Sequence, residues 1–309
     1  MSLVVVGSVA FDSIKTPQGQ IDEALGGSAT HFALAASLFT PVQLVGVVGD
    51  DFPKEHLDLL SSHSVDLDGL RVVDGGKTFR WSGEYFDDMN QRETLSVELN
   101  VLDNYEPVIP EGYRNSRFLF LGNGPPVTQA STLDQMTDNP FVVADTMDLW
   151  IQTERKALMD LLPRLDGLVL NEQEAFLLTD DRNLVSAGRK ILAMGPRYVV
   201  VKKGEHGAMI FHPDGQIALP AQPLPSVEDP TGAGDSFAGG LMGYLARHGE
   251  TDLESFKNAV AWGTVTASFC CEAFGVKGIL GSNPELLRAR FEEYRGMLTL
   301  LGHSAALSG

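Results

Sequence analysis

Short apolar segments recur along the chain and alternate with longer segments that have the periodicity of helices. Six of these apolar segments are rich in β-branched residues and are predicted to be strands: residues 3–6, 42–47, 117–121, 141–144, 167–170 and 198–201. Several are apolar without interruption, which is typical of parallel strands buried on both faces. Helices are predicted between them at residues 28–39, 54–62, 152–161, 172–178 and 183–193. This order predicts an α/β fold with a doubly wound, mostly parallel sheet.

Residues 70–100 interrupt this alternation. The segment combines β-forming residues with weak helical periodicity, and Asp74-Gly75-Gly76 has the composition of a hairpin turn. We predict a small β element that projects from the main sheet; a surface hairpin without a role is the alternative. Two further helices are expected at residues 236–248 and 253–272, and Gly249 occupies the position of a C-terminal helix cap.

Composition narrows the class of protein. The chain has 309 residues, of which 43% are hydrophobic and 21% charged, as in globular proteins and unlike disordered or collagen-like chains. Its length allows one large domain or two smaller ones. Because no linker or repeat divides it, we predict a single domain over residues 1–309. The N-terminal apolar segment is too short for a signal peptide or a membrane span.

The net charge restricts the expected binding partners, and the cysteines indicate the expected cellular compartment. Asp and Glu total 41 against 23 Lys and Arg, which gives a formal charge of −18. Such a chain repels nucleic acids and anionic membranes, so neither is expected as a partner. The two cysteines, Cys270 and Cys271, are adjacent and form neither a disulfide framework nor a tetrahedral metal site. The reducing cytoplasm is therefore the expected compartment.

The strongest chemical signal is a glycine-rich turn before the helix expected at residues 236–248. Gly232-Ala233-Gly234 lets the backbone approach a ligand, and the free amides of a first helical turn bind anions. Asp235 follows directly, and we expect the helix start to keep it ionised at pH 7. An ionised carboxylate beside an anion site can accept a proton from a hydroxyl during phosphoryl transfer. An aspartate that only caps the helix is the alternative.

Other phosphate-binding motifs do not match. A dinucleotide-binding G-x-G-x-x-G would need glycine at position 237, where Phe237 stands, so a nicotinamide oxidoreductase is not expected. Gly76-Lys77-Thr78 has the ending of a Walker A loop, but Arg71 occupies the place of the leading glycine and no strong helix follows.

Four separated segments together resemble the ribokinase/PfkB carbohydrate kinase family. In the order of that family, they are Gly7 with Asp12, Gly26-Gly27 before the helix from Ser28, residues 171–174 with 203–207, and residues 229–235. The resemblance implies a three-layer α/β/α sandwich with a mostly parallel central sheet. It also implies a small β lid, formed by about residues 12–25 and 70–100.

The resemblance implies roles on the nucleotide side. Asp235 matches the base that deprotonates the acceptor hydroxyl, and Gly232, Ala233 and Gly234 match the anion hole for the transferred phosphate. Asn171 and Glu174 match a pair tied to Mg²⁺ through bound water, although an exposed helix carboxylate is the simpler interpretation of Glu174. The other matches are a turn beside the nucleotide at Lys203, Gly204 and Gly207, a monovalent-cation segment for K⁺ at Asp229 and Thr231, and an adenosine contact at Asn258.

On the acceptor side, Asp12 matches the carboxylate that binds sugar hydroxyls, and a carboxylate can accept two hydroxyl hydrogens. A turn cap is the alternative for this residue. Gly27 would let the acceptor pack on the backbone. Closure of the lid, which includes Thr78, would exclude water. Members of the family often dimerise through the lid, so a homodimer is expected.

Two departures from the family bear on the acceptor. The family usually has asparagine where this chain has His31, so His31 marks a different acceptor unless it is simply a satisfied helix residue. Residues 119–126 lack the glutamate of ribose-specific members, and Asn123 is the candidate substitute. Ribokinase and fructokinase proper are therefore less expected than a kinase for a polyol, a nucleoside or an unusual sugar.

We predict a phosphotransferase that uses ATP and Mg²⁺, with K⁺ as a candidate further cofactor. Its acceptor is a hydroxyl of a small sugar, polyol or related molecule. A nucleoside kinase of the same family is one alternative. A non-catalytic regulator that binds sugar or nucleotide on the same fold is the other.

Overall fold

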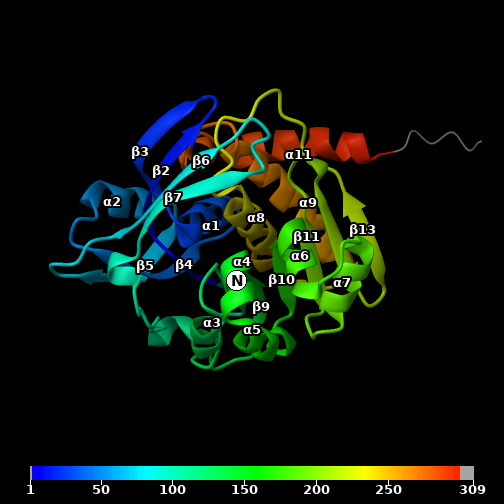
Figure 1. Cartoon of the computed structure of the whole chain (residues 1–309), viewed down its shortest axis with the longest axis horizontal. Coiled ribbons are helices and arrows are strands. Elements are labelled where there is room, and N and C mark those ends of the chain that lie inside the picture. Colours follow the sequence, from blue (N-terminus) through cyan, green and yellow to red (C-terminus); the bar gives the residue numbers. More distant parts are fainter. Residues whose placement is uncertain (1, 300–309) are drawn as a thin grey trace, which may run out of the picture.

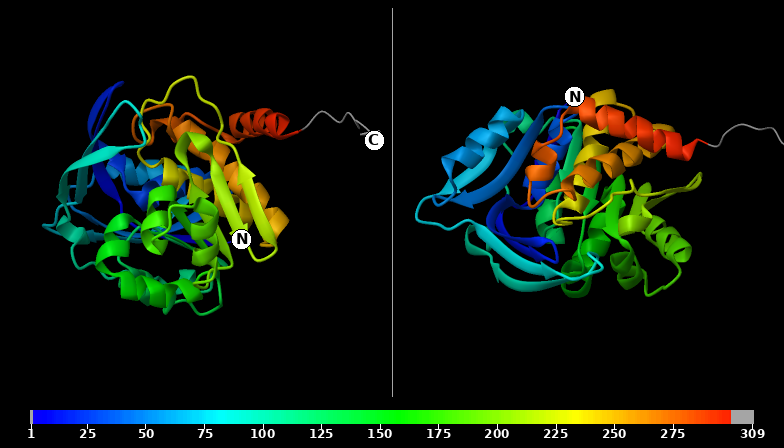
Figure 2. Two further views of the ribbon diagram at one scale, coloured as in Figure 1. Left: turned by 45° about the vertical axis from the view of Figure 1, so that its right-hand side comes forward. Right: turned by 90° about the horizontal axis from the view of Figure 1, so that it is seen from above.

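The computed structural model describes residues 2–299, in which nine strands form one sheet with helices on both faces (Figures 1 and 2). We call it the large sheet, and its strand order is β13-β12-β11-β10-β9-β8-β1-β4-β5. The strands from β11 to β5 in this order run parallel to one another, whereas β12 is antiparallel to both β11 and β13. The strands are β1 (Leu3–Val6), β4 (Val42–Gly49), β5 (Val65–Val73), β8 (Phe118–Leu121), β9 (Phe141–Asp145), β10 (Gly167–Asn171), β11 (Tyr198–Lys202), β12 (Ala208–His212) and β13 (Gly215–Leu219).

Alternate residues of the central strands belong to two separate cores. In β1, Leu3 and Val5 pack into one core, and Val4 and Val6 into the other. This burial on both faces is the reason for the uninterrupted apolar segments in the sequence. The first core includes α1 (Ser28–Ser37), α2 (Lys54–Ser62), α8 (Ala233–His248), α9 (Leu253–Cys270), α10 (Lys277–Leu280) and α11 (Pro284–Leu298). The second includes α3 (Pro126–Leu133), α4 (Asp148–Thr153), α5 (Arg155–Leu161), α6 (Glu172–Thr179) and α7 (Leu184–Leu192). The predicted three-layer α/β/α arrangement is confirmed.

A second sheet, which we call the small sheet, has the strand order β3-β2-β6-β7 in the part of the chain that the structure describes. Its strands are β2 (Ala10–Thr16), β3 (Gly19–Gly26), β6 (Phe79–Tyr85) and β7 (Arg92–Glu98). Figure 1 shows it in blue and cyan, and its strand β3 contacts α1. Two stretches of chain distant in sequence therefore build the predicted β element. Its action as a lid belongs to the function proposed below.

The structure corrects two local predictions. The turn at Asp74-Gly75-Gly76 does not close a hairpin: it leaves β5, a parallel edge strand of the large sheet, and leads to β6 of the small sheet. Strand β5 lacked an apolar signal because most of its residues are partly or fully exposed. The helix expected at residues 152–161 is two helices, because Glu154 between them has φ −125° and ψ 31°, outside the helical region.

Two other predictions concern membrane-spanning segments and the number of domains. Within residues 2–299, no helix combines the length and the apolar character needed to cross a membrane. That residues 1–309 form a single domain stays a prediction.

Candidate active site

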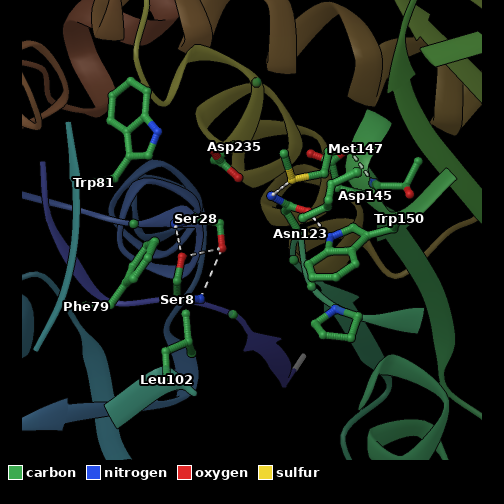
Figure 3. A pocket seen from close by; sticks show the side chains of 18 of the residues that line it. Ser8, Ser28, Phe79, Trp81, Leu102, Asn123, Asp145, Met147, Trp150 and Asp235 are labelled. Carbon is green, nitrogen blue, oxygen red and sulfur yellow. Dashed lines mark hydrogen bonds between the residues drawn. The ribbon is translucent and has the colours of Figure 1, made fainter. Parts of the chain in front are cut away.

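A cavity of about 990 Å³ lies where the parallel strands of the large sheet end, next to the small sheet (Figure 3). The large sheet contributes residues that end its strands or follow them within two positions, namely Ser8, Asn123, Asp145, Asn171 and Lys202. Ligands of open α/β sheets bind at the carboxyl ends of the strands. The volume is at the upper end of the roughly 300–1,000 Å³ of small-molecule sites, so two substrates fit side by side.

The start of α8 forms one wall of this cavity. Gly232 has a φ of 75°, in the left-handed region that favours glycine, and α8 begins at the next residue. A Cβ atom at position 232 would overlap the imidazole of His31. A Cβ atom at Gly234 would lie 2.9 Å from Nζ of Lys202. The N–H of Ala233 donates to the carbonyl oxygen of Pro230 at 3.1 Å. The turn thus combines a helix start with a nearby cation, the features that an anion site needs.

Asp235 lies in the first turn of α8 and lines the cavity. Burial, and after it the charge of Asp145, raise the pKa of Asp235 to about 7, against the opposing charges of Lys202 and Arg92. The prediction that the helix start keeps this carboxylate fully ionised at pH 7 is therefore wrong, because burial and Asp145 outweigh it. A carboxylate with a pKa near the working pH is suited to general base catalysis.

Lys202 and Asp145 form an ion pair beside this carboxylate. Nζ of Lys202, at the end of β11, lies 3.6 Å from Oδ2 of Asp145, at the end of β9. Burial alone would lower the pKa of Lys202, but the charges of Asp145, Glu174 and Asp235 raise it overall. Lys202 therefore stays protonated and supplies positive charge next to the glycine turn.

Asn171 and Glu174 form a capping box at the start of α6. Oδ1 of Asn171 accepts the backbone N–H of Glu174 at 2.9 Å, and Oε2 of Glu174 accepts that of Asn171 at 2.7 Å. Burial, and after it the charge of Asp145, raise the pKa of Glu174 to about 7. Glu174 is buried, so the simpler interpretation of an exposed helix carboxylate is wrong.

The same carboxylates are candidates for binding a divalent cation. In residues 2–299 no three His, Cys, Asp or Glu side chains are grouped as a metal cage. Mg²⁺ usually keeps several waters and needs only one or two protein carboxylates. A cation near Glu174 would also offset the repulsion between Glu174 and Asp145. The residues present therefore fit Mg²⁺ held through water.

Asp12 approaches the cavity from the small sheet. Its Oδ2 accepts the backbone N–H of Gly27 at 3.3 Å. Gly27 has a φ of 93°, and a Cβ atom there would lie 2.5 Å from the carbonyl oxygen of Ser8. Ser8 and Ser28 exchange hydrogen bonds between hydroxyl and backbone N–H at 3.1 and 3.0 Å, which fixes this corner (Figure 3). Burial is the main reason that the pKa of Asp12 rises to about 7.

Aromatic and apolar side chains line the rest of the cavity: Phe79, Trp81, Leu102, Met147 and Trp150 (Figure 3). Asn123 fixes two of them. Its Oδ1 accepts the indole N–H of Trp150 at 2.9 Å, and its Nδ2 donates to Sδ of Met147 at 3.0 Å. We call Trp81, Trp150 and Met147 the aromatic chamber. Rigid indole faces of this kind suit a planar ligand group.

His31 lies behind the glycine turn and is only 1% exposed. Its Nδ1 is 3.9 Å from Sγ of Cys270, and its Nε2 has no hydrogen-bond partner among the residues described. Burial lowers the pKa of His31 to about 4, so the ring is neutral at pH 7. It lies against the glycine turn and Cys270, and a contact with the acceptor stays a prediction.

A family model described as pfkB family carbohydrate kinase matches residues 125–280. The chain belongs to this pfkB family. It is 32% identical over 255 residues to the cytidine kinase of Thermococcus kodakarensis, which covers 80% of this chain and 89% of that protein. It is 30% identical over 251 residues to the ATP-dependent ribose-1-phosphate kinase of Halopiger xanaduensis, with 78% and 80% covered.

A solved structure agrees with this assignment. The nucleoside kinase of Methanocaldococcus jannaschii, described as an archaeal member of the ribokinase family, superposes with a TM-score of 0.77. The match covers 94% of this chain and 98% of that one at 21% identity, which shows a shared fold.

As a pfkB kinase, the chain is a phosphotransferase with a hydroxyl acceptor, in a group that contains sugar and nucleoside kinases.

The pfkB fold brings most of the predicted site residues to one cavity. Those that line it are Asp12, Gly27, His31, Asn123, Asn171, Glu174, Thr231, Gly232, Gly234 and Asp235. Ala233 is the first residue of α8 between two of them. Asp229 is buried nearby, and its two carboxylate oxygens accept the backbone N–H groups of Thr231 and Gly275, each at 2.8 Å.

The remaining predicted residues lie outside the cavity lining. Lys203, Gly204 and Gly207 belong to the turn after β11, Asn258 lies in α9, and Thr78 joins the two sheets by donating its hydroxyl to Oδ1 of Asp51 at 2.6 Å.

Sequence reasoning missed several cavity residues: Lys202, Asp145, Arg92, Trp81 and Trp150. Lys202 and Asp145 each stand directly after an apolar strand segment, so the rule for strand ends could have found both. For Arg92 and the two tryptophans, the sequence carries no local signal.

Proposed function

We propose that this pfkB kinase phosphorylates a hydroxyl of a nucleoside, with ATP as the donor and Asp235 as the base. One arrangement carries the proposal: Asp235 and the glycine turn share a single cavity with Asp12 and the aromatic chamber. A nucleobase stacks on an indole ring through its whole π-face, whereas a sugar or polyol offers only C–H groups to such a ring. The similarity to a cytidine kinase supports the same choice.

Asp12 and the aromatic chamber would bind different parts of the nucleoside. The carboxylate of Asp12 would accept hydrogen bonds from ribose hydroxyls, next to the backbone at Gly27. In Figure 3, Trp81 and Trp150 stand on opposite sides of the cavity, so the base would pack against an indole face. Asn123 holds the Trp150 ring through the indole N–H, which keeps this wall rigid.

The phosphoryl group is transferred in line between the two substrates. The acceptor oxygen forms a bond to the γ-phosphorus as the bond from that phosphorus to the β–γ bridging oxygen breaks. The electron pair of the broken bond leaves with ADP, and the hydroxyl proton passes to the carboxylate of Asp235. The amides of Gly232 and Gly234 and the Lys202 ammonium stabilise the negative charge on the transferring group.

Two cations complete the proposal. Glu174, through bound water, would hold Mg²⁺, which supplies positive charge to the phosphates of ATP. Asp229 and Thr231 would help to hold K⁺. Burial raises the pKa of Asp229, and its carboxylate accepts the backbone N–H groups of Thr231 and Gly275, so a cation there would offset a buried charge.

The small sheet is proposed to act as the lid. It supplies Asp12, Phe79 and Trp81 to the cavity, so its closure would exclude water from the reacting groups. Its outer strand, β7, is exposed at all seven residues and is an edge strand. Edge strands pair readily with other strands, which supports the expected homodimer through this sheet.

A sugar or sugar phosphate is the second candidate acceptor, because of the similarity to a ribose-1-phosphate kinase. The test is ADP release with ATP, Mg²⁺ and K⁺ across ribonucleosides, sugars, polyols and ribose 1-phosphate. We expect the highest kcat/KM with a nucleoside. A higher value for any acceptor without a base would overturn the nucleoside assignment. A control variant, Asp58→Asn, changes an exposed carboxylate of α2 and should match wild type.

A further inference from the structure

A glutamine in the cavity lining uses one end of its amide to join two strand ends of the large sheet. Gln129 lies in α3, is only 5% exposed and lines the cavity. Its Nε2 donates to the carbonyl oxygens of Gly122, after β8, and Asp145, at the end of β9, each at 2.9 Å. Both partners are backbone carbonyls, which only accept, so the NH₂ end of the amide must face them.

The other end of this amide is left as an acceptor. Within residues 2–299, Oε1 of Gln129 accepts no hydrogen bond, and it is not one of the enclosed polar atoms without a partner. It therefore keeps some accessible surface, and the surface that Gln129 offers lies in the cavity. An acceptor in so buried a side chain costs free energy unless a donor pairs with it. This atom is thus suited to a donor carried by a substrate.

Gln129 lies next to the wall of the aromatic chamber. The two carbonyls that hold its amide belong to residues one position before Asn123 and two positions before Met147. Asn123 binds Met147 and holds the ring of Trp150 (Figure 3). Thr146, directly before Met147, also lines the cavity, and its buried hydroxyl has no partner among the residues described. Unpaired polar atoms thus border the wall on which the base is proposed to stack.

We propose that Gln129 selects nucleosides whose base carries an exocyclic amino group, as cytosine and adenine do. That group is a hydrogen-bond donor, whereas uracil and hypoxanthine carry a carbonyl acceptor at the same ring position. Oε1 of Gln129 accepts an N–H of the amino group and repels the carbonyl. The inference rests on the proposed nucleoside kinase function and names the class of base that it takes.

The amide of Gln129 cannot adapt to the other class of base. Rotation by 180° would bring its NH₂ group to the cavity, where it could donate to a base carbonyl. The same rotation would place Oε1 against the carbonyl oxygens of Gly122 and Asp145, three acceptors without a hydrogen between them. Because unpaired buried acceptors are costly, the structure holds the amide in one orientation. The two strand ends therefore fix which kind of base edge is accepted.

The test measures kcat/KM for two pairs of nucleosides that differ in this one group, cytidine with uridine and adenosine with inosine. Gln129→Leu is compared with wild type and with Gln135→Leu. Gln135 is a matched control outside the described cavity lining: its amide accepts the N–H of Ile109 and donates to the carbonyl of Pro107, each at 2.9 Å. Thermal melting of each variant checks the fold.

We expect wild type to prefer the amino nucleoside of the better pair about tenfold or more, because its rival leaves Oε1 unpaired against a carbonyl. Gln129→Leu should bring that ratio within about threefold of unity, whereas Gln135→Leu should keep the ratio of wild type. A wild-type ratio within about threefold of unity for both pairs would overturn the proposal. Equal losses for both members of a pair in Gln129→Leu would do so too, since they would leave Gln129 only its contacts to the strand ends.

A second measurement keeps the proposal testable if Gln129→Leu does not fold. Pyrimidin-2-one riboside and purine riboside carry hydrogen in place of the amino group of cytidine and adenosine. In wild type, each should have a lower kcat/KM than the amino nucleoside that it copies. Analogues that match or exceed the amino nucleosides would refute the role of Gln129, because no donor would then be needed.

The two proposals fail in different ways. If wild type phosphorylates no nucleoside, or prefers an acceptor without a base, the proposed nucleoside kinase is wrong. Titration calorimetry of cytidine, uridine, adenosine and inosine, with Mg²⁺ and the non-hydrolysable ATP analogue AMP-PNP, then decides whether Gln129 reads the amino group. Nucleosides that do not bind at all would refute both proposals.

Discussion

The imidazole of His31 fills the space in which a Cβ atom of residue 232 would lie. The buried side chain of His31 and the glycine turn, which lies 201 positions later in the sequence, therefore pack directly against each other. The neutral ring supports the turn from behind, so the amides of the proposed anion hole face the cavity. This relationship gives His31 a physical role in the site that is independent of the identity of the acceptor.

Gly232→Ala should therefore distort both the glycine turn and the packing of His31 behind it. The methyl group collides with His31, and a φ of 75° costs an alanine about 1–2 kcal/mol. We expect kcat to fall at least about 100-fold, with a lower melting temperature. The double variant Gly232→Ala/His31→Ala relieves the collision and should recover part of the lost stability. Additive losses in the double-mutant cycle would contradict the contact.

The pH dependence should report the ionisation of Asp235. Its pKa is raised from 3.8 to about 7, so the base is protonated, and the enzyme inactive, below that value. We expect kcat/KM to rise with pH and to level off above about pH 7. Lys202→Met removes a charge that lowers this pKa, so the rise should move to higher pH.

Asp12 provides the control for this assignment, because its pKa is also raised to about 7. If Asp235 is the group observed, Asp12→Asn keeps the rise in kcat/KM and weakens acceptor binding. A profile that is flat from pH 5 to 8 in wild type, or a shift to lower pH in Lys202→Met, would refute the assignment to Asp235.

The aromatic chamber should discriminate among acceptors. Stacking of a base on an aromatic side chain contributes about 1–3 kcal/mol, so Trp81→Ala should raise the nucleoside KM about 5- to 150-fold. Trp81→Phe should preserve most of the affinity. Kinetics with the best nucleoside and with ribose measure the effect. Equal losses for both acceptors would show that Trp81 does not contact a base.

The contact between Asn90, in the hairpin of residues 86–91 that joins β6 to β7, and Glu205, in the turn after β11, should control the placement of that hairpin. Asn90→Asp puts two carboxylates in place of a 2.6 Å hydrogen bond, so the hairpin should separate from the turn after β11. We expect kcat/KM to fall about tenfold relative to wild type. Because salt screens exposed charges, the difference in kcat/KM between Asn90→Asp and wild type should become smaller at about 0.5 M NaCl. The double variant Asn90→Asp/Glu205→Gln restores a donor and an acceptor and should regain activity, and failure to do so would refute this contact.

The fold was predictable because its signals are local. Each central strand is an apolar segment of four to eight residues, and the helices between them have their own periodicity. The edge strand β5 escaped detection because it is buried at few positions, so its sequence is largely polar. The turn at Asp74-Gly75-Gly76 looks like a hairpin because turn chemistry does not reveal which sheet receives the next strand.

The site was predictable only where its residues are contiguous. The segment from Asp229 to Asp235 carries its anion-binding geometry in the sequence itself. The pKa of Asp235 does not, because it depends on Asp145 and Lys202, which reach the carboxylate from two separate strands. Arg92 and Trp81 belong to the site only because the small sheet lies against the ends of the large one.

The most direct test of the account is Asp235→Asn with the preferred acceptor. The amide keeps the shape of the side chain and cannot accept the hydroxyl proton. The account predicts a loss of kcat of at least about 10²–10⁴-fold, the contribution of a general base, with AMP-PNP affinity and folding preserved. An Asp235→Asn variant that turns over within tenfold of wild type would contradict the assignment of Asp235 as the base.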